Sequence, residues 1–439
     1  MPFFKRSTLH LACFFLFLLC GSSRADHSLQ HTTSKQPIID EIIIKGLWRT
    51  ESNVIHRELL FSKNDILTTK ALLESVQRLK NLKLFSKVIP LLKLKSNNHV
   101  ILTIEVEEKW TIIPYFNFAV GGGTTHIVSG IYDINVFGKY VESGFQYDNW
   151  NGEHGGAFWI HQPRFLNKRL LFKFEIASNK YIRQLYTTDA ISQGSFRYQR
   201  KRFTLALEKE ITPVFHLGLR GDLLDDTIES TTAKTAMDKN TLSLLNSTNN
   251  DADKLVTYII ELGKLDLDLY LVKGYQSRLT YQHNATILNS NNKIRDLVWR
   301  NKFFWHLPYK GNLGVKLSLG RSESEKIQHL NYIGGFINIR GYRDGQFRDN
   351  AYWQFNTEYR IPSIRNQWVV LQHIFFIDAA GTASELNKLR IEKNSNISAG
   401  TGFRLISPKV YNFNGRLDIA IFGTGTNQNK ISLGAQQFF

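Results

Sequence analysis

From Trp110 to the end of the chain, apolar and polar residues alternate with a period of two, and this pattern constrains the fold most strongly. In YWQFNTEYRI (352–361), one set of alternate positions carries Gln354, Asn356 and Glu358, whereas the other is mainly apolar. LLFKFEI (170–176) and LDLDLY (265–270) alternate in the same way. Successive side chains of a strand point to opposite faces, so each segment predicts a strand with one polar and one apolar face.

Alternation of this kind fits both a half-buried soluble sheet and a transmembrane barrel with a watery interior. Three features favour the barrel: an export signal, the absence of cysteine from the mature chain, and an aromatic content of 13%. Residues 110–439 number 330, which gives sixteen strands about 21 residues each, including turns and loops. We therefore predict an all-β transmembrane barrel of about 16 antiparallel strands over 110–439, and twelve or fourteen strands remain compatible with this length.

The first 25 residues have the composition of a secretory signal peptide. Lys5 and Arg6 precede the apolar run LACFFLFLLC (11–20), and SSRA (22–25) supplies small residues before a cleavage site. A lipoprotein signal at Cys20 is the alternative, although Leu19 stands where a small residue is expected. Residues 26–37 are polar and predict a flexible leader.

Removal of the signal peptide determines both the cysteine content and the charge of the mature chain. Cys13 and Cys20 both lie in the signal, so the mature protein can form no disulfide. The formal charge of +17 falls to +14 when Lys5, Arg6 and Arg24 are removed. In an exported protein this charge favours an anionic membrane face as its counterpart, and we expect no nucleic-acid partner.

Residues 38–108 have a mixed pattern that predicts one small α+β domain. IIDEIIIKG (38–46) is typical of a strand, and Thr50 is a plausible cap for the helix that follows. A second helix is indicated in 68–82, where leucine and valine recur at helical spacing. KVIPLLKLK (87–95) and HVILTIEVEE (99–108) predict two strands around a turn.

The chain carries no recognisable catalytic motif. G-x-S-x-G, H-E-x-x-H and a glycine-rich phosphate loop are all missing from the sequence, and the thirteen histidines are dispersed. We therefore expect no enzyme activity, no metal and no other cofactor. The segment 225–254 is rich in Ser, Thr, Asn and Asp, and we expect it to form a long surface loop.

Several segments together resemble the BamA/TamA superfamily of outer-membrane assembly and translocation proteins. IIIKGLWRTESNVIHREL and LKNLKLFSKVIPLL are similar to the POTRA domain of that family, with Lys83 at a position where glycine is usual. YIGGFINIRGYRDGQ is similar to the inward-folded loop of the family barrel, and NTEYRIP and FFIDAAG to the strands that follow. The matches run in order from about 38 to 439, and their combination is specific.

The resemblance implies a set of site residues. The arginine of the RGY motif, Arg340, would reach into the barrel lumen and pair with Glu358 and Asp378 on neighbouring strands, with Gly341 and Tyr342 completing the loop anchor. A guanidinium can bind carboxylates through parallel hydrogen bonds, which suits a charge with little solvent access. Phe439 would end the terminal strand and lie at the seam where the barrel closes.

The resemblance also implies a function and a location. The POTRA domain, in the periplasm, would capture unfolded outer-membrane or secreted client proteins, and the barrel, in the bacterial outer membrane, would insert or export them through a gated seam. The lipid bilayer and periplasmic accessory proteins would be the other partners. Two alternatives stay open: a passive channel for small solutes with the POTRA domain as a docking module, and a structural or antigenic surface protein.

Overall fold

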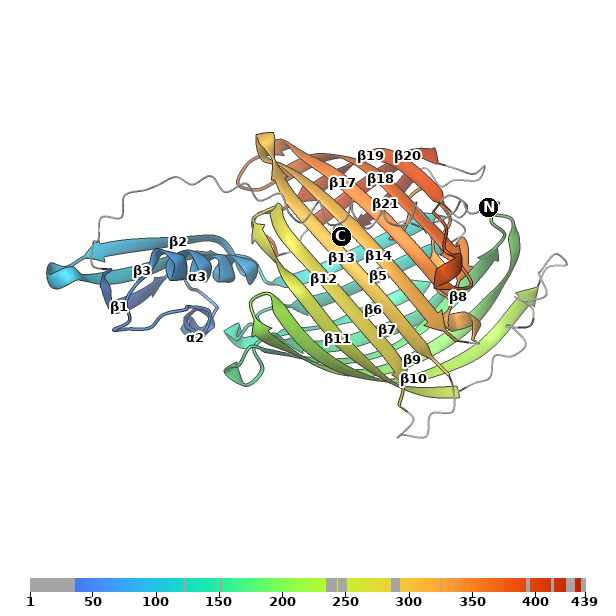
Figure 1. Cartoon of the computed structure of the whole chain (residues 1–439), viewed down its shortest axis with the longest axis horizontal. Helices are drawn as coiled ribbons and strands as arrows, with labels where there is room; N and C mark the ends of the chain where they lie inside the picture. The colour runs from blue at the N-terminus through green and yellow to red at the C-terminus, as the bar shows by residue number, and fades with distance from the viewer. Residues whose placement is uncertain are drawn as a thin grey trace, which may run out of the picture.

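The protein consists of a small N-terminal α+β domain and a large β-barrel, and the domain lies at one open end of the barrel (Figure 1). This description rests on a computed structural model. It covers residues 36–121, 124–150, 152–233, 243, 251–285, 293–324, 326–335, 337–391, 395–411, 414–423 and 431–435. The segments expected to be the signal peptide (1–25) and most of the leader lie outside these residues.

The small domain is a three-stranded sheet with two helices. Strand β1 (Ile38–Lys45) pairs in parallel with β3 (His99–Glu108), which pairs antiparallel with β2 (Phe85–Leu94). Helices α2 (Ser52–His56) and α3 (Thr69–Asn81) connect β1 to β2. The hydroxyl of Thr68 accepts a hydrogen bond from the backbone N–H of Ala71 and caps α3.

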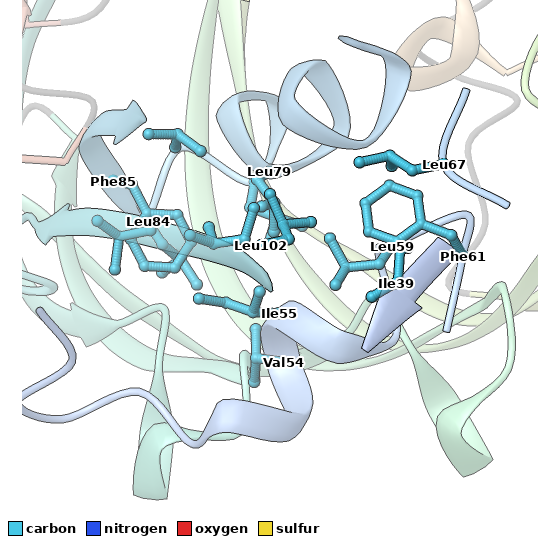
Figure 2. Packing of buried hydrophobic residues seen from close by; sticks show 14 of the residues in the cluster. Ile39, Val54, Ile55, Leu59, Phe61, Leu67, Leu79, Leu84, Phe85 and Leu102 are labelled. Carbon is cyan, nitrogen blue, oxygen red and sulfur yellow. The ribbon is translucent and has the colours of Figure 1, made fainter. Parts of the chain in front are cut away.

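The core of the small domain forms between the sheet and the helices. Figure 2 shows side chains from β1, α2, α3 and β3 converging on one another. The fully buried members include Ile39, Ile55, Leu79, Leu102 and Ile104. The apolar positions of α3 and alternate positions of β3 supply this core, as the sequence periodicity predicts.

The barrel is a single sheet of sixteen strands among the described residues, and sequence neighbours are neighbours in the sheet, apart from a two-stranded insertion between β14 and β17. The ladders whose pairing is recorded are antiparallel. The strands are β4 (Ile112–Gly121), β5 (Thr124–Asp133), β6 (Glu142–Trp150), β7 (Glu153–Gln162), β8 (Leu170–Tyr186), β9 (Ser192–Thr212), β10 (Phe215–Ala233), β11 (Asp251–Asp268), β12 (Leu271–Asn284), β13 (Arg295–Leu307), β14 (Gly311–Glu323), β17 (Ala351–Arg365), β18 (Val370–Ala383), β19 (Asn396–Ile406), β20 (Asn414–Gly423) and β21 (Ile431–Ala435).

The sheet closes on itself because Cα atoms of β21 lie within 8 Å of Cα atoms of β4. The prediction of an α+β domain followed by an all-β barrel of about sixteen strands is confirmed. No helix among the described residues has the length and apolar character to cross a membrane.

The two faces of the barrel wall differ in the way that the alternation predicts. On β17, Asn356, Glu358 and Arg360 are fully buried on the lumenal face. On β18, Phe375 and Ile377 are each 49% exposed on the outer face, whereas Asp378 is fully buried inside. The wall therefore presents apolar side chains outward and keeps polar and charged ones inside.

Two sequence expectations outside the site are wrong. Residues 225–233 and 251–254 belong to β10 and β11, so the predicted loop 225–254 is wrong at both ends. Strand β10 continues because β9 pairs with it as far as Ala233. The threonines and Ile228 favour a strand here, and pairing with a neighbour outweighs the low strand propensity of Asp225 and Asp226. Thr50 caps no helix; its hydroxyl accepts a hydrogen bond from the Asn135 side chain in the barrel.

Charged contacts fix the small domain against the barrel turns. Glu58, which is fully buried, accepts two hydrogen bonds from Arg164 at 2.6 and 2.9 Å and one from Arg78 at 2.9 Å. Glu210 at the end of β9 pairs with Arg78 at 3.4 Å and with Arg169 at 3.2 Å. These ion pairs join α3 and the segment after α2 to the turn after β7 and to the end of β9, so the domain and the barrel share one polar interface.

Candidate lumenal site

The segment between β14 and β17 folds into the barrel. It contains the short strands β15 (Asn331–Ile333) and β16 (Phe347–Asp349), which pair with each other as a two-stranded sheet. The stretch between them carries Arg340 and Tyr342, which are 0% and 2% exposed. We call residues 326–350 the lumenal loop.

Gly341 allows the tip of this loop to approach the wall. Its φ of +89° lies in the left-handed region that disfavours residues with a Cβ. A Cβ at this position would lie 2.9 Å from the Cβ of Ala420 on β20 and 3.7 Å from that of Ser398 on β19. Both the backbone angle and the lack of space therefore require glycine beside Arg340.

Arg340 is held by two carboxylates on adjacent strands. Its Nε and Nη2 donate to Oδ2 and Oδ1 of Asp378 at 2.7 and 2.8 Å, and its backbone N–H donates to Oδ2 at 3.1 Å. Its Nη1 donates to Oε1 of Glu358 at 2.6 Å. All three side chains are buried, and charge-assisted hydrogen bonds of this kind are the strong ones in proteins.

Neighbouring groups complete the seat of Arg340. The ring of Phe376 lies below the guanidinium, with its centroid 3.6 Å from Cζ. The amide of Asn356 donates to Oδ1 of Asp378 at 2.9 Å. The hydroxyl of Tyr342 donates to the carbonyl of Ile397 at 2.9 Å. The loop tip is thus fixed by β17, β18 and β19 together.

The charge cluster extends to β19 and β20. Arg404 bridges Glu358, at 2.5 Å, and Asp418, at 2.7 Å. Arg360 donates to Glu358 at 2.8 Å, and Arg416 lies 3.2 Å from Asp418. The cluster comprises four arginines and three carboxylates, so the charges within it are compensated except for one positive charge.

The opposite wall of the barrel also holds the lumenal loop. Arg348 donates to the carbonyl of Tyr186 on β8 at 2.7 Å and to Gln193 on β9 at 3.1 Å. At the start of the loop, His329 lies 3.7 Å from carboxylate oxygens of Asp226 on β10 and Asp253 on β11. The loop therefore crosses the lumen and contacts the wall on both sides.

The chemistry of the cluster suits binding rather than catalysis. Arginine stays protonated, and both oxygens of Asp378 and Glu358 accept hydrogen bonds from arginine or asparagine side chains. Among the described residues, no group of three or more His, Cys, Asp or Glu side chains is placed to hold a metal ion. The arrangement can brace a loop inside a wall.

The structure brings together most of the residues that the sequence singled out. Arg340, Glu358 and Asp378 form one cluster with Gly341 and Tyr342 beside it. Phe439 lies outside the described residues.

Sequence reasoning missed Arg404 and Asp418. Each is a single charged residue inside a strongly apolar strand, GFRLI or LDIAIF. That pattern could have indicated lumenal positions, although it does not reveal their partners.

Comparisons with known proteins agree with this architecture. Residues 137–438 match the family model described as the Omp85 superfamily domain, and residues 37–109 match a POTRA model described as a surface antigen variable number repeat. A Treponema pallidum (strain Nichols) protein named as an outer membrane protein assembly factor is 28% identical over 108 residues. That match covers 24% of this chain and 12% of the relative, so the chain spans a small part of the length of this relative.

Solved structures show the same fold at low sequence identity. BamA from Haemophilus ducreyi lacking POTRA domains 1–3 has a TM-score of 0.53 and 15% identity, with 91% of this chain and 84% of that chain covered. CdiB from Escherichia coli has a TM-score of 0.63 and 10% identity, with coverage of 92% and 76%. CdiB from Acinetobacter baumannii has a TM-score of 0.55 and 13% identity, with coverage of 91% and 73%.

Proposed function

The chain belongs to the Omp85 superfamily, and from that premise we propose that it is an outer-membrane protein assembly or translocation factor. The POTRA domain captures unfolded outer-membrane or secreted client chains in the periplasm, and the barrel inserts or exports them. Lipid and periplasmic accessory proteins are its other partners. The observation that carries the proposal is the lumenal loop, pinned through Arg340 to Glu358 and Asp378 above a docked POTRA domain.

The orientation follows from the lengths of the connections. Turns at the POTRA end of the barrel are short, as between β11 and β12 or β13 and β14, whereas the connections β10–β11 and β14–β17 at the other end are long. Barrels of the outer membrane have short periplasmic turns and longer external loops. The POTRA domain therefore faces the periplasm.

The edge of β2 is the proposed capture surface. Strand β2 is an outer strand of the POTRA sheet and exposes Ile89, Leu91, Leu92 and Leu94, which are 43–74% exposed. The other outer strand, β1, is partly covered, because Ile39 exchanges backbone hydrogen bonds with Asn64 and Asp65. An extended client can add to β2 through main-chain hydrogen bonds and place its apolar side chains over the exposed leucines.

The seam between β4 and β21 is the proposed exit. The hydrogen-bonded order of the sheet begins at one of these strands and ends at the other, although the two lie side by side. The described part of β21 covers five residues, against ten in β4. We propose that a client leaves sideways between these two terminal strands, or pairs with one of their edges as a new strand.

The anchored loop distinguishes this proposal from a passive solute channel. Residues 326–350 cross the lumen and contact β8, β9, β17 and β18. A loop held at both walls narrows the free cross-section, which serves a gated conduit better than an open pore. We propose that the arginine cluster keeps the lumenal loop in place while β4 and β21 separate to let a client pass.

The function is tested by depleting the protein and measuring two outcomes in the same cells. We expect loss of particular outer-membrane or secreted proteins from quantitative proteomes, with unchanged uptake of small hydrophilic solutes. Wild-type protein and Arg295→Ala, which alters an exposed arginine (66%), should restore the proteome, and Arg340→Ala should not. Normal proteomes combined with impaired solute uptake would contradict the proposal and favour the channel.

A further inference from the structure

A small, partly open pocket lies where the POTRA domain meets the turn between β11 and β12. The POTRA wall comes from the end of α3, the start of β2 and the residue that follows β3, and the barrel wall comes from the turn. The lining residues are Lys80, Phe85, Ser86, Lys87, Val88, Lys109, Leu267, Asp268 and Leu269. Three of them are lysines and one is acidic.

The carboxylates at this pocket are already paired. Asp268 accepts from Lys80 at 3.1 Å and is 62% exposed. Glu107, at the end of β3, pairs with Lys87 at 2.9 Å and also with Lys409 from the turn between β19 and β20. Neither acid is left to neutralise a further ammonium group.

Lys109 is the unusual member of the lining. It is 7% exposed, and its side chain has no hydrogen-bond or ion-pair partner among the described residues. Burial, with repulsion from Lys83, lowers the pKa of Lys109 to about 8. The Nζ of Lys109 is not among the fully buried polar atoms that lack a partner, and Lys109 lines the pocket. An anion bound there would stabilise the charged form of this poorly solvated lysine.

Lys83 adds a second uncompensated charge behind Lys109. The backbone N–H of Lys109 donates to the carbonyl of Leu84 at 2.8 Å, which places the two lysines on adjacent chain segments. Lys83 has a φ of +61°, where glycine would be free of strain. A lysine here is disfavoured by the backbone, and its half-buried ammonium group lies near that of Lys302 on β13 without a partner among the described residues.

We propose that this pocket, lined by Lys80, Lys87 and Lys109 and backed by Lys83, binds a phosphoryl group at the junction of the POTRA domain and the barrel. Lysine binds phosphate as a point charge, and the ammonium groups at this pocket outnumber the two carboxylates, Asp268 and Glu107, which suits a divalent anion. The bound anion would link α3 and β2 to the barrel turn, since its ligands come from the POTRA domain and the turn backbone closes the site.

Free phosphate and the headgroup of an anionic phospholipid present the same chemistry, and two measurements separate these sources. Calorimetry in detergent micelles, at pH 7 and fixed ionic strength, titrates the full chain with inorganic phosphate. Photoreactive phosphatidylglycerol in nanodiscs, compared with photoreactive phosphatidylcholine, reports labelling of the peptide that contains residues 80–109. If only inorganic phosphate binds, the ligand is a free anion. If photoreactive phosphatidylglycerol labels the peptide, the ligand is a lipid headgroup.

The variants are Lys109→Met and Lys83→Gly, with Lys93→Met as the matched control on an exposed part of β2. Lys83→Gly relieves a strained backbone angle, so the variant should fold. Its folded barrel should still change electrophoretic mobility on heating, as that of the wild type does. We expect both variants to weaken binding by about tenfold or more, the effect of one charged hydrogen bond, and the control to bind as wild type does. The proposal is overturned if wild type binds neither probe, or if it binds them no better than the two variants do.

Discussion

Arg340 and Asp378 are joined by three hydrogen bonds, two from the guanidinium and one from the backbone N–H of Arg340, although 38 residues separate them in the sequence. The side-chain pair orients the arginine, and the backbone contact fixes the path of the loop itself. Because Glu358 takes the remaining terminal nitrogen, the loop cannot shift along the wall without breaking several buried polar contacts at once.

Arg340→Ala should lower the free energy of unfolding of the barrel by about 3–5 kcal/mol, since it leaves Asp378 and Glu358 buried with fewer counter-charges. Arg340→Lys should fall between this variant and the wild type, because an ammonium group cannot reproduce the two parallel hydrogen bonds to Asp378. The measurement is the denaturant midpoint of the heat-modifiable band on gels. Equal midpoints for Arg340→Ala and the control Arg295→Ala would refute the anchor role.

Gly341→Ala should destabilise the loop by about 1–3 kcal/mol, because it places a Cβ at a positive φ and against the Cβ of Ala420. Removing the obstructing methyl with Ala420→Gly should recover part of the loss, since the backbone strain remains. Denaturation of the two single variants and the double variant gives the coupling. If the changes in unfolding free energy of Gly341→Ala and Ala420→Gly simply add in the double variant, the two side chains are not in contact.

Glu58→Gln should loosen the POTRA domain from the barrel. Burial acts to raise the pKa of Glu58, but Arg164 and Arg78 outweigh it, so the pKa lies below its usual value. The contact is therefore fully present above the unfolded pKa of about 4.3 and is lost as pH falls through the lower folded value.

Spin-label distances between α3 and the turn after β7 measure this contact. We expect the distribution to broaden for Glu58→Gln at pH 7, and to stay narrow for Glu51→Gln, which removes an exposed carboxylate 4.0 Å from Lys139. Equally narrow distributions for both variants would mean that other contacts suffice to hold the domain.

The pKa of Lys109, lowered to about 8 by burial and by Lys83, predicts a rise of stability with pH. Between about pH 8 and 10.4 the unfolded chain binds the proton that the folded chain has lost, so stability increases over this window. The free energy of unfolding rises by about 3 kcal/mol over this window. The buffer must contain no multivalent anion, because a bound anion would stabilise the charged form of Lys109. The pH profile of Lys109→Met, subtracted from that of the wild type, should contain this rise, and a flat difference would contradict it.

The sequence alone predicts most of the barrel strands and part of the charge cluster around Arg340. Alternation is a local property, so Glu358 could be assigned to the lumenal face of β17 from its neighbours alone. Arg404 and Asp418 could not be assigned to the charge cluster around Arg340 in advance, because their contacts depend on the register of four strands. That register is set by the side-chain patterns of the paired strands together with the turns that join them, so the residues of one strand alone do not reveal it.

The errors have the same physical origin. Thr50 has the residue type of a helix cap, yet its hydroxyl binds Asn135 of the barrel, which is 85 residues away. The segment 225–233 is mostly polar and lacks sustained alternation, yet β9 extends the sheet through it. In both cases a tertiary partner, invisible in the local pattern, decided the conformation.

Hydrogen–deuterium exchange of residues 326–350 in proteoliposomes tests the central claim most directly. The account predicts slow exchange of this loop in the wild type and in Arg295→Ala, and exchange faster by at least an order of magnitude in Arg340→Ala, since loss of one buried ion pair costs about 3–5 kcal/mol. Rapid exchange in the wild type, or equal protection in Arg340→Ala, would contradict a lumenal loop pinned by this arginine.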